Sequence, residues 1–147
     1  MTRDSAWRRA AIAAAIFVAL DQITKQIVIA SIRPADKVNV FFGIDLTNTR
    51  NKGVAFGALA GRGWVVPALT LAALTLLIGY FVLRSSTPWL WLPVGIIAGG
   101  ALGNLADRAR DGAVIDFIDP VLWPAFNLAD MGIVLGILGL LYVVEKK

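Results

Sequence analysis

Asp116 and Asp130 stand without a basic neighbour along the chain. Asp116 has no Lys or Arg within five residues, and Asp130 has none within four. A carboxylate without a nearby cation must find another partner or hold a proton. If Asp116 and Asp130 meet, they cannot both ionise cheaply, so the pair shares one proton. The ionised member can then take a proton from water while the protonated member polarises a peptide carbonyl, as in aspartic proteases.

The composition removes most other hydrolytic mechanisms. The chain contains no histidine and no cysteine. Nucleophile–histidine pairs and the common zinc-protease site are therefore excluded. Hydrolysis by this chain would have to rest on carboxylates, on lysine, or on a hydroxyl paired with lysine. We expect no metal and no cofactor.

Further polar residues recur at helical spacing inside apolar stretches. Within each set the members lie three or four positions apart, so each set falls on one face of a helix. Charged residues in such stretches normally face the interior of a bundle. We therefore expect these sets to converge in one polar cluster. The sets are Asp21, Thr24 and Lys25; Asn104, Asp107 and Arg108; and Asn127 with Asp130.

The elements that would carry these residues are transmembrane helices. The chain is 58% hydrophobic and only 16% charged, whereas soluble domains carry about a quarter charged residues. A transmembrane helix needs about 20 mostly apolar residues. The predicted fold is an all-α membrane protein, a four-helix bundle forming one domain over residues 1–147. The four expected spans are 10–32, 64–83, 89–106 and 126–144.

The N-terminal stretch has a second interpretation. Arg3, Arg8 and Arg9 before the apolar run Ala10–Leu20 are typical of a cleavable signal peptide. The apolar pattern resumes at Ile27–Ile32, however, so we favour a retained first helix.

Four spans would place both termini on one side of the membrane. Basic residues are densest in the short segments on that side, so both termini are predicted to be cytoplasmic. At about 1.5 Å per residue, Asp21 lies roughly 18 Å and Asp130 roughly 21 Å from the cytoplasmic ends of their helices. Asp107 lies roughly 27 Å along the third helix. The polar cluster is therefore expected near the outer face.

Two outer segments, 33–62 and 107–125, connect the spans. Residues 38–42 and 44–47 are rich in β-branched and aromatic residues, with Gly43 between them, and predict two short strands. Residues 55–60 could form a short interfacial helix. The fold would then include a small extracytoplasmic β-rich part.

Five strings in the chain resemble the motifs of the lipoprotein signal peptidase (signal peptidase II) family. The family patterns are DxxTK, NxGxAF, GGxxGNxxDR, VxDF and FNxAD, and they occur here in the family's order. Each motif alone is weak, but together they cover nearly the whole chain. The strings are DQITK (21–25), NKGVAFG (51–57), GGALGNLADR (99–108), VIDF (114–117) and FNLAD (126–130).

The resemblance implies a membrane aspartyl endopeptidase that removes the signal peptide of bacterial prolipoproteins, cutting before a cysteine that carries a diacylglyceryl group. It implies Asp116 and Asp130 as the catalytic pair. It also implies an inner-membrane location, membrane lipids as neighbours and inhibition by the antibiotic globomycin. We expect a monomer. The implied supporting or substrate-binding residues are Asn104, Arg108, Asn127, Asp107, Asp21, Lys25, Asn51 and Gly53.

Other functions remain as alternatives on the residues alone. Asp21, Asp107 and Asp130 could serve as cation ligands in a transporter or channel subunit. The same polar residues could instead only join helices, for example through an Asp21–Lys25 pair. A nucleic-acid partner is not expected, because the basic residues form no stripe and no nucleic-acid motif is present.

Overall fold

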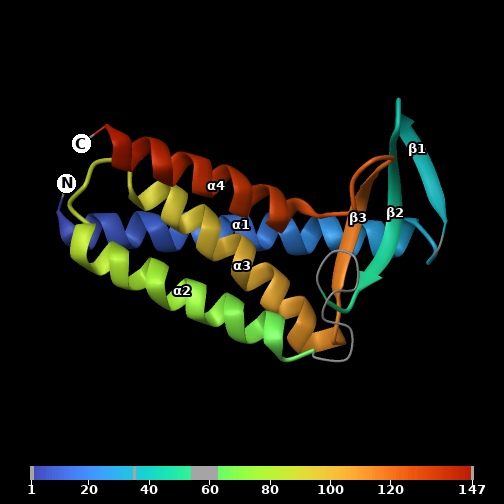
Figure 1. The fold of residues 1–147 in the computed structure, drawn as a ribbon, viewed down its shortest axis with the longest axis horizontal. Helices are drawn as coiled ribbons and strands as arrows, with labels where there is room; N and C mark the ends of the chain where they lie inside the picture. The colour runs from blue at the N-terminus through green and yellow to red at the C-terminus, as the bar shows by residue number, and fades with distance from the viewer. Residues whose placement is uncertain (1, 35, 54–62, 147) are drawn as a thin grey trace.

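The computed structural model describes residues 2–34, 36–53 and 63–146, and its helices lie side by side in an elongated bundle (Figure 1). Both termini lie at one end of the bundle, and a small sheet lies at the other. The elements are α1 (Arg3–Ser31), β1 (Lys37–Phe41), β2 (Ile44–Asn51), α2 (Val65–Arg84), α3 (Trp91–Asp111), β3 (Val114–Pro120) and α4 (Leu128–Glu145).

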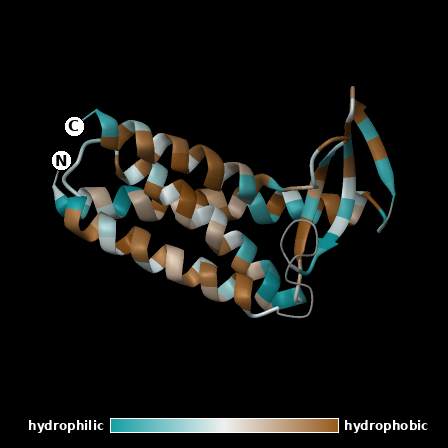
Figure 2. Cartoon of the chain, in the orientation of Figure 1, coloured by the Kyte–Doolittle hydropathy of each residue, from teal (hydrophilic) through white to brown (hydrophobic). Residues whose placement is uncertain are grey.

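Within the described residues, α1, α2 and α4 are long and apolar enough to cross a membrane. These three helices correspond to the predicted spans 10–32, 64–83 and 126–144. The predicted span 89–106 is also helical, as α3, but α3 does not belong to this apolar group. Its glycines and polar residues explain the difference. Figure 2 shows apolar residues along most of the bundle and polar residues at both of its ends.

α3 occupies the centre of the bundle, where it contacts α1, α2 and α4. Small residues permit this close packing. A Cβ added at Gly99 would lie 2.7 Å from the backbone oxygen of Ala14 in α1. A Cβ added at Gly100 would lie 2.6 Å from the backbone oxygen of Ala129 in α4. The helix backbones therefore approach each other as closely as glycine allows, which is how helices associate in membranes.

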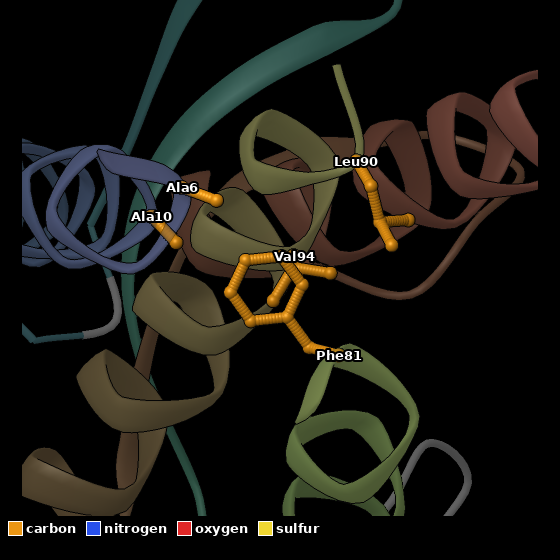
Figure 3. Packing of buried hydrophobic residues seen from close by; sticks show 5 residues of the cluster. All are labelled: Ala6, Ala10, Phe81, Leu90 and Val94. Carbon is orange, nitrogen blue, oxygen red and sulfur yellow. The ribbon is translucent and has the colours of Figure 1, made fainter. Parts of the chain in front are cut away.

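An apolar core closes the end of the bundle that carries the termini. Phe81 from α2 is fully buried between Ala6 and Ala10 of α1 and Val94 of α3, together with Leu90 (Figure 3). The ring of Trp7 meets Phe81 edge-on at 4.8 Å between centroids. The interior of this end is thus filled mainly by hydrophobic side chains, whereas the buried charged groups lie toward the sheet.

The sheet has three antiparallel strands in the order β1-β2-β3. The strands predicted at 38–42 and 44–47 correspond to β1 and β2, joined at Gly43, which adopts a positive φ of 70°. β3 was not expected, because residues 107–125 were interpreted only as an outer segment. The interfacial helix suggested at 55–60 lies outside the described residues.

A tight turn connects the bundle to the sheet. α3 continues to Asp111, beyond the expected boundary at residue 106, and ends at Gly112 with a φ of 67°. The Gly112 N–H donates to the Arg108 carbonyl at 3.0 Å. Glycine is the usual residue at such a left-handed helix end. After Ala113 the chain enters β3, so Asp116 lies close to the sheet end of α3.

The close packing of α3 generates a test of stability. Substitution Gly99→Ala should lower the unfolding temperature in detergent, because the new methyl group forces α1 away, at a cost of about 1–3 kcal/mol. The matched control is Gly79→Ala in α2, where an added Cβ meets nothing within 4 Å. This control should be neutral or slightly stabilising, since alanine favours helices. Equal effects of the two substitutions would contradict the packing described.

Candidate active site

The site is built around a buried lysine. Lys25 of α1 is fully buried, and its ammonium lies 2.8 Å from Asp21 Oδ2 and 2.7 Å from Asp107 Oδ2. Its third contact is a hydrogen bond to Asn104 Oδ1 at 2.9 Å. An ammonium has three donors, so all three are used. The lysine thereby joins α1 to α3.

Asp21 extends this network to α4. Its Oδ1 accepts a hydrogen bond from the Ala129 N–H at 3.0 Å. Ala129 lies in the first turn of α4, where backbone N–H groups have no partner within the helix. The carboxylate therefore satisfies an otherwise unpaired donor and complements the positive end of the helix dipole. Thr24, in contrast, donates to carbonyls of its own helix.

A capping box positions Asp130. Asn127 is the N-cap of α4, and its Oδ1 accepts from the Asp130 N–H at 3.0 Å. In return, Asp130 Oδ2 accepts from the Asn127 N–H at 3.2 Å. This reciprocal pairing is the geometry of a capping box. Helix formation itself therefore fixes the direction of the Asp130 carboxylate.

Two asparagine side chains connect the carboxylates. Asn104 Nδ2 donates to Asp130 Oδ1 at 2.8 Å. Asn127 Nδ2 lies 2.8 Å from Asp116 Oδ1 and 3.1 Å from Asn104 Oδ1. Asn127 thus contacts Asp116 through its side chain and Asp130 through its backbone and side chain. Both carboxylates thus receive hydrogen bonds from the neutral amides of asparagine.

Asp116 lies in β3 and is almost fully buried, at 3% exposure. Its Oδ2 accepts from Asn51 Nδ2 at 2.9 Å, and Asn51 Oδ1 in turn accepts from the Gly53 N–H at 2.9 Å. Burial raises the pKa of Asp116 to about 6, and the negative charge of Asp130 adds to this rise. The amides of Asn51 and Asn127 and the charge of Lys25 act in the opposite direction.

A cavity of about 370 Å³ contains both aspartates in its wall. Asn51, Gly53, Asn104 and Arg108 also line it, and residues 123–126 form an apolar side. Arg108 Nη1 is 3.4 Å from the Asn104 carbonyl. The cavity therefore offers two carboxyl groups, amide donors and a cation to a bound molecule.

The structure brings together the residues that the spacing predicted, except Thr24, whose hydroxyl donates within α1. Asp21, Lys25, Asn104, Asp107, Asn127 and Asp130 form one network between α1, α3 and α4. Asp116, Asn51, Gly53 and Arg108 join it at the sheet and the cavity.

Sequence reasoning missed two participants. Gln22 Nε2 donates to Asp107 Oδ1 at 2.9 Å, although Gln22 lies beside the expected polar stripe of α1. Arg110 contacts both Gln22 Oε1, at 3.1 Å, and Asp107 Oδ1, at 3.3 Å. The sequence shows that Gln22 and Arg110 are polar. It does not show which residue on another helix each of them contacts.

Comparison with known proteins adds a second line of evidence to this geometry. The sequence model of the family described as signal peptidase (SPase) II matches residues 13–145. The chain belongs to the signal peptidase II family. Family membership implies a protease, and the match includes every residue of the network.

Individual relatives agree with this assignment. A protein named lipoprotein signal peptidase from Oleidesulfovibrio alaskensis is 43% identical over 84% of this chain and 85% of its own. One of the same name from Syntrophus aciditrophicus is 39% identical over 92% of this chain and 91% of its own. A solved bacterial membrane enzyme superposes with a TM-score of 0.81 at 29% identity, over 93% of this chain and 87% of that one.

The buried lysine gives a prediction about stability. Lys25→Met should destabilise the protein strongly, at a cost of about 3–5 kcal/mol. Asp21 would lose its cation while buried, and Asp107 would keep only the half-exposed Arg110. Thermal unfolding in detergent would measure the effect. Lys37→Met is the matched control, since Lys37 pairs with Asp119 but its side chain is 59% exposed. The control should change stability little; a comparable loss in both variants would disprove the role given to Lys25.

Proposed function

We propose that this chain is an aspartyl endopeptidase that removes the signal peptide from diacylglyceryl-modified prolipoproteins. The observation that carries the proposal is that Asp116 and Asp130 line one cavity and both bind Asn127. Family membership supports the substrate class. The position of the lipidated cysteine directly after the cleaved bond follows from the resemblance of the five motifs.

Asp116 and Asp130 would act as a pair that shares one proton. Asp116 holds that proton in the free enzyme, because its raised pKa keeps it protonated to about pH 6. The ionised member takes a proton from water, the oxygen of which attacks the peptide carbonyl carbon. The protonated member donates to the carbonyl oxygen. The resulting diol collapses with a proton transferred to the leaving nitrogen, which yields a carboxylate and a free amine.

The asparagines would keep the pair in a reactive geometry. Asn104 and Asn127 each donate to a carboxylate oxygen and present no charge. A cation in their place would hold the carboxylates ionised and remove the shared proton. Arg108, at the cavity wall, is available to bind a polar part of the substrate.

The fold suggests how such a substrate would reach the site. In the proposed topology all four helices cross the inner membrane, both termini are cytoplasmic, and the sheet lies at the outer face. α3 crosses despite its low hydropathy because the other helices surround it. The lipid and the signal helix would then arrive from the bilayer while water enters from outside. We propose that the enzyme acts as a monomer and is a target of globomycin.

The transporter alternative receives no support from the family match. It would use Asp21 and Asp107 as cation ligands, yet both already contact the ammonium of Lys25. Within the part of the chain that the structure describes, no group of three or more carboxylate, imidazole or thiol side chains is arranged to hold a metal ion.

The dyad is tested by removing one carboxylate at a time. Asp116→Asn and Asp130→Asn should each reduce cleavage of a purified lipidated prolipoprotein by about 10²–10⁴-fold, because each carboxyl group transfers a proton. Binding of the substrate and thermal unfolding should change far less. Asp119→Asn, in the same strand but paired with exposed Lys37, should retain activity. Substantial cleavage by either dyad variant would exclude the mechanism, and a loss of folding without a specific loss of activity would favour a structural role.

The raised pKa of Asp116 gives a pH prediction. As pH rises through about 6, Asp116 loses the proton of the pair, so kcat/KM of the free enzyme should fall. The Asn51 amide stabilises the ionised carboxylate and lowers the pKa of Asp116. Asn51→Ala should therefore raise this pKa and move the descending limb of the pH profile to higher pH. An unchanged or acid-shifted limb would contradict the assignment of the proton to Asp116.

A further inference from the structure

A second hollow lies at the opposite end of the bundle from the aspartates. It has a volume of about 600 Å³ and runs along the seam between α1 and α3. We call it the α1–α3 groove and define it by its lining residues, which are Arg9, Ile12, Ala13, Ile16, Phe17, Trp89, Trp91, Leu92 and Ile96. The proposed proteolysis uses none of these residues.

The groove follows from the helix geometry. The α1 residues that line it, from Arg9 to Phe17, recur every three or four positions and thus form one face. α3 approaches α1 closely at Gly95 and Gly99, where an added Cβ would lie within 2.7 Å of α1 backbone oxygens. Two helices that touch through small residues leave a shallow channel beside the contact. Ile12 and Ile16 remain 52% and 57% exposed in it.

One end of the groove differs chemically from the rest. Among the described residues that line it, Arg9 alone carries a charge. The Arg9 guanidinium lies 5.8 Å from the centroid of the Trp91 ring, and Trp91 stacks with Trp89 at 6.2 Å. Tryptophans that flank apolar surface mark the boundary between hydrocarbon and headgroups in membrane proteins. The mouth of the groove thus combines a cation with two interfacial aromatic rings.

The backbone at the mouth is strained. Trp89 has a φ of 64° and is the one described residue other than glycine with a positive φ. This conformation is unfavourable for a bulky side chain, and such strain is concentrated at ligand clamps and functional sites. In this conformation the Trp89 ring, 66% exposed, stacks on Trp91 at the groove mouth.

The length of the groove identifies its occupant. From Arg9 to Phe17 α1 rises about 12 Å, which is close to the roughly 15 Å of hydrocarbon in one leaflet. A partner helix that crosses the membrane would need about twice that length. We propose that the α1–α3 groove binds one anionic phospholipid, its phosphate at Arg9 and the two tryptophans and one acyl chain against Ile12, Ile16 and Ile96. The site is independent of the proposed catalysis.

The test compares lipids with the same acyl chains and with headgroups of different net charge. Purified protein in detergent receives phosphatidylglycerol or phosphatidylcholine with identical acyl chains, and thermal unfolding and native mass spectrometry report binding. Phosphatidylglycerol should raise the unfolding temperature of the wild type more than phosphatidylcholine does, and one molecule should be retained. Equal effects of the two lipids would overturn the proposal, because they would indicate filling of the groove without recognition of charge.

Two arginine variants distinguish binding in the groove from nonspecific electrostatic attraction of anionic lipid to the protein. Arg9→Gln should weaken phosphatidylglycerol binding by about fivefold or more, on the order expected for one basic residue at an anionic headgroup. Arg8→Gln removes the same charge from the adjacent exposed residue, which does not line the groove, and should keep the wild-type response. An equal loss in both variants would overturn the proposal.

Two further variants test the groove itself. Trp89→Gly relieves the backbone strain and should fold at least as well as the wild type, yet lose the preference for phosphatidylglycerol. Ile12→Trp should fill the exposed channel and abolish retention of the lipid while the protein remains folded. Retained lipid in both variants would contradict the site. Dimerisation of the wild type in detergent, abolished by Ile12→Trp, would instead identify a second copy of the chain as the occupant and exclude the lipid.

Discussion

The structure depends on the burial of one ammonium among apolar helices. Lys25 would be too costly to bury alone, and each of its donors contacts an oxygen of Asp21, Asn104 or Asp107. Because these oxygens come from two helices and Asp21 also binds the start of a third, the same interaction fixes the relative positions of α1, α3 and α4. Apolar packing alone gives no such register, since helices in a lipid phase can slide with little change in hydrophobic burial.

The two groups of buried carboxylates differ in the partners that bind them. Lys25 compensates the carboxylates deep in the bundle, whereas Asp116 and Asp130 receive neutral amides from Asn51, Asn104 and Asn127. Amides orient a carboxyl group without forcing it to ionise. Asn104 links the two groups, because its oxygen accepts from Lys25 while its nitrogen donates to Asp130. The supporting ion pairs and the candidate dyad are therefore connected through Asn104, and the charge of Lys25 also lowers the pKa of Asp116.

The sequence predicted the helices and the polar cluster for simple physical reasons. Long apolar runs have few alternatives to helix, and polar residues three or four positions apart must share a face. β3 was not predicted because buried residues occupy both faces of the strand, among them Val114, Ile115 and Phe117. The segment therefore shows no clear alternation of apolar and polar residues. The bond from Gln22 to Asp107 could not be predicted, since it depends on the rotation of α1 against α3. The capping box at Asn127 and Asp130 was readable in principle, because its residue types and spacing are local.

The left-handed turn at Gly112 has a mechanical consequence. With only Gly112 and Ala113 between α3 and β3, the connection has no slack, and a tilt of α3 must carry the strand with it. Asn104 of α3 and Asp116 of β3 would therefore move together. The longer connection to α4, residues 121–127, returns to the same strand, where Phe126 pairs with Ile118. Because Asn127 bonds to both Asp116 and Asp130, and Asn104 bonds to Asp130, the two carboxylates cannot move apart without losing one of these amide contacts.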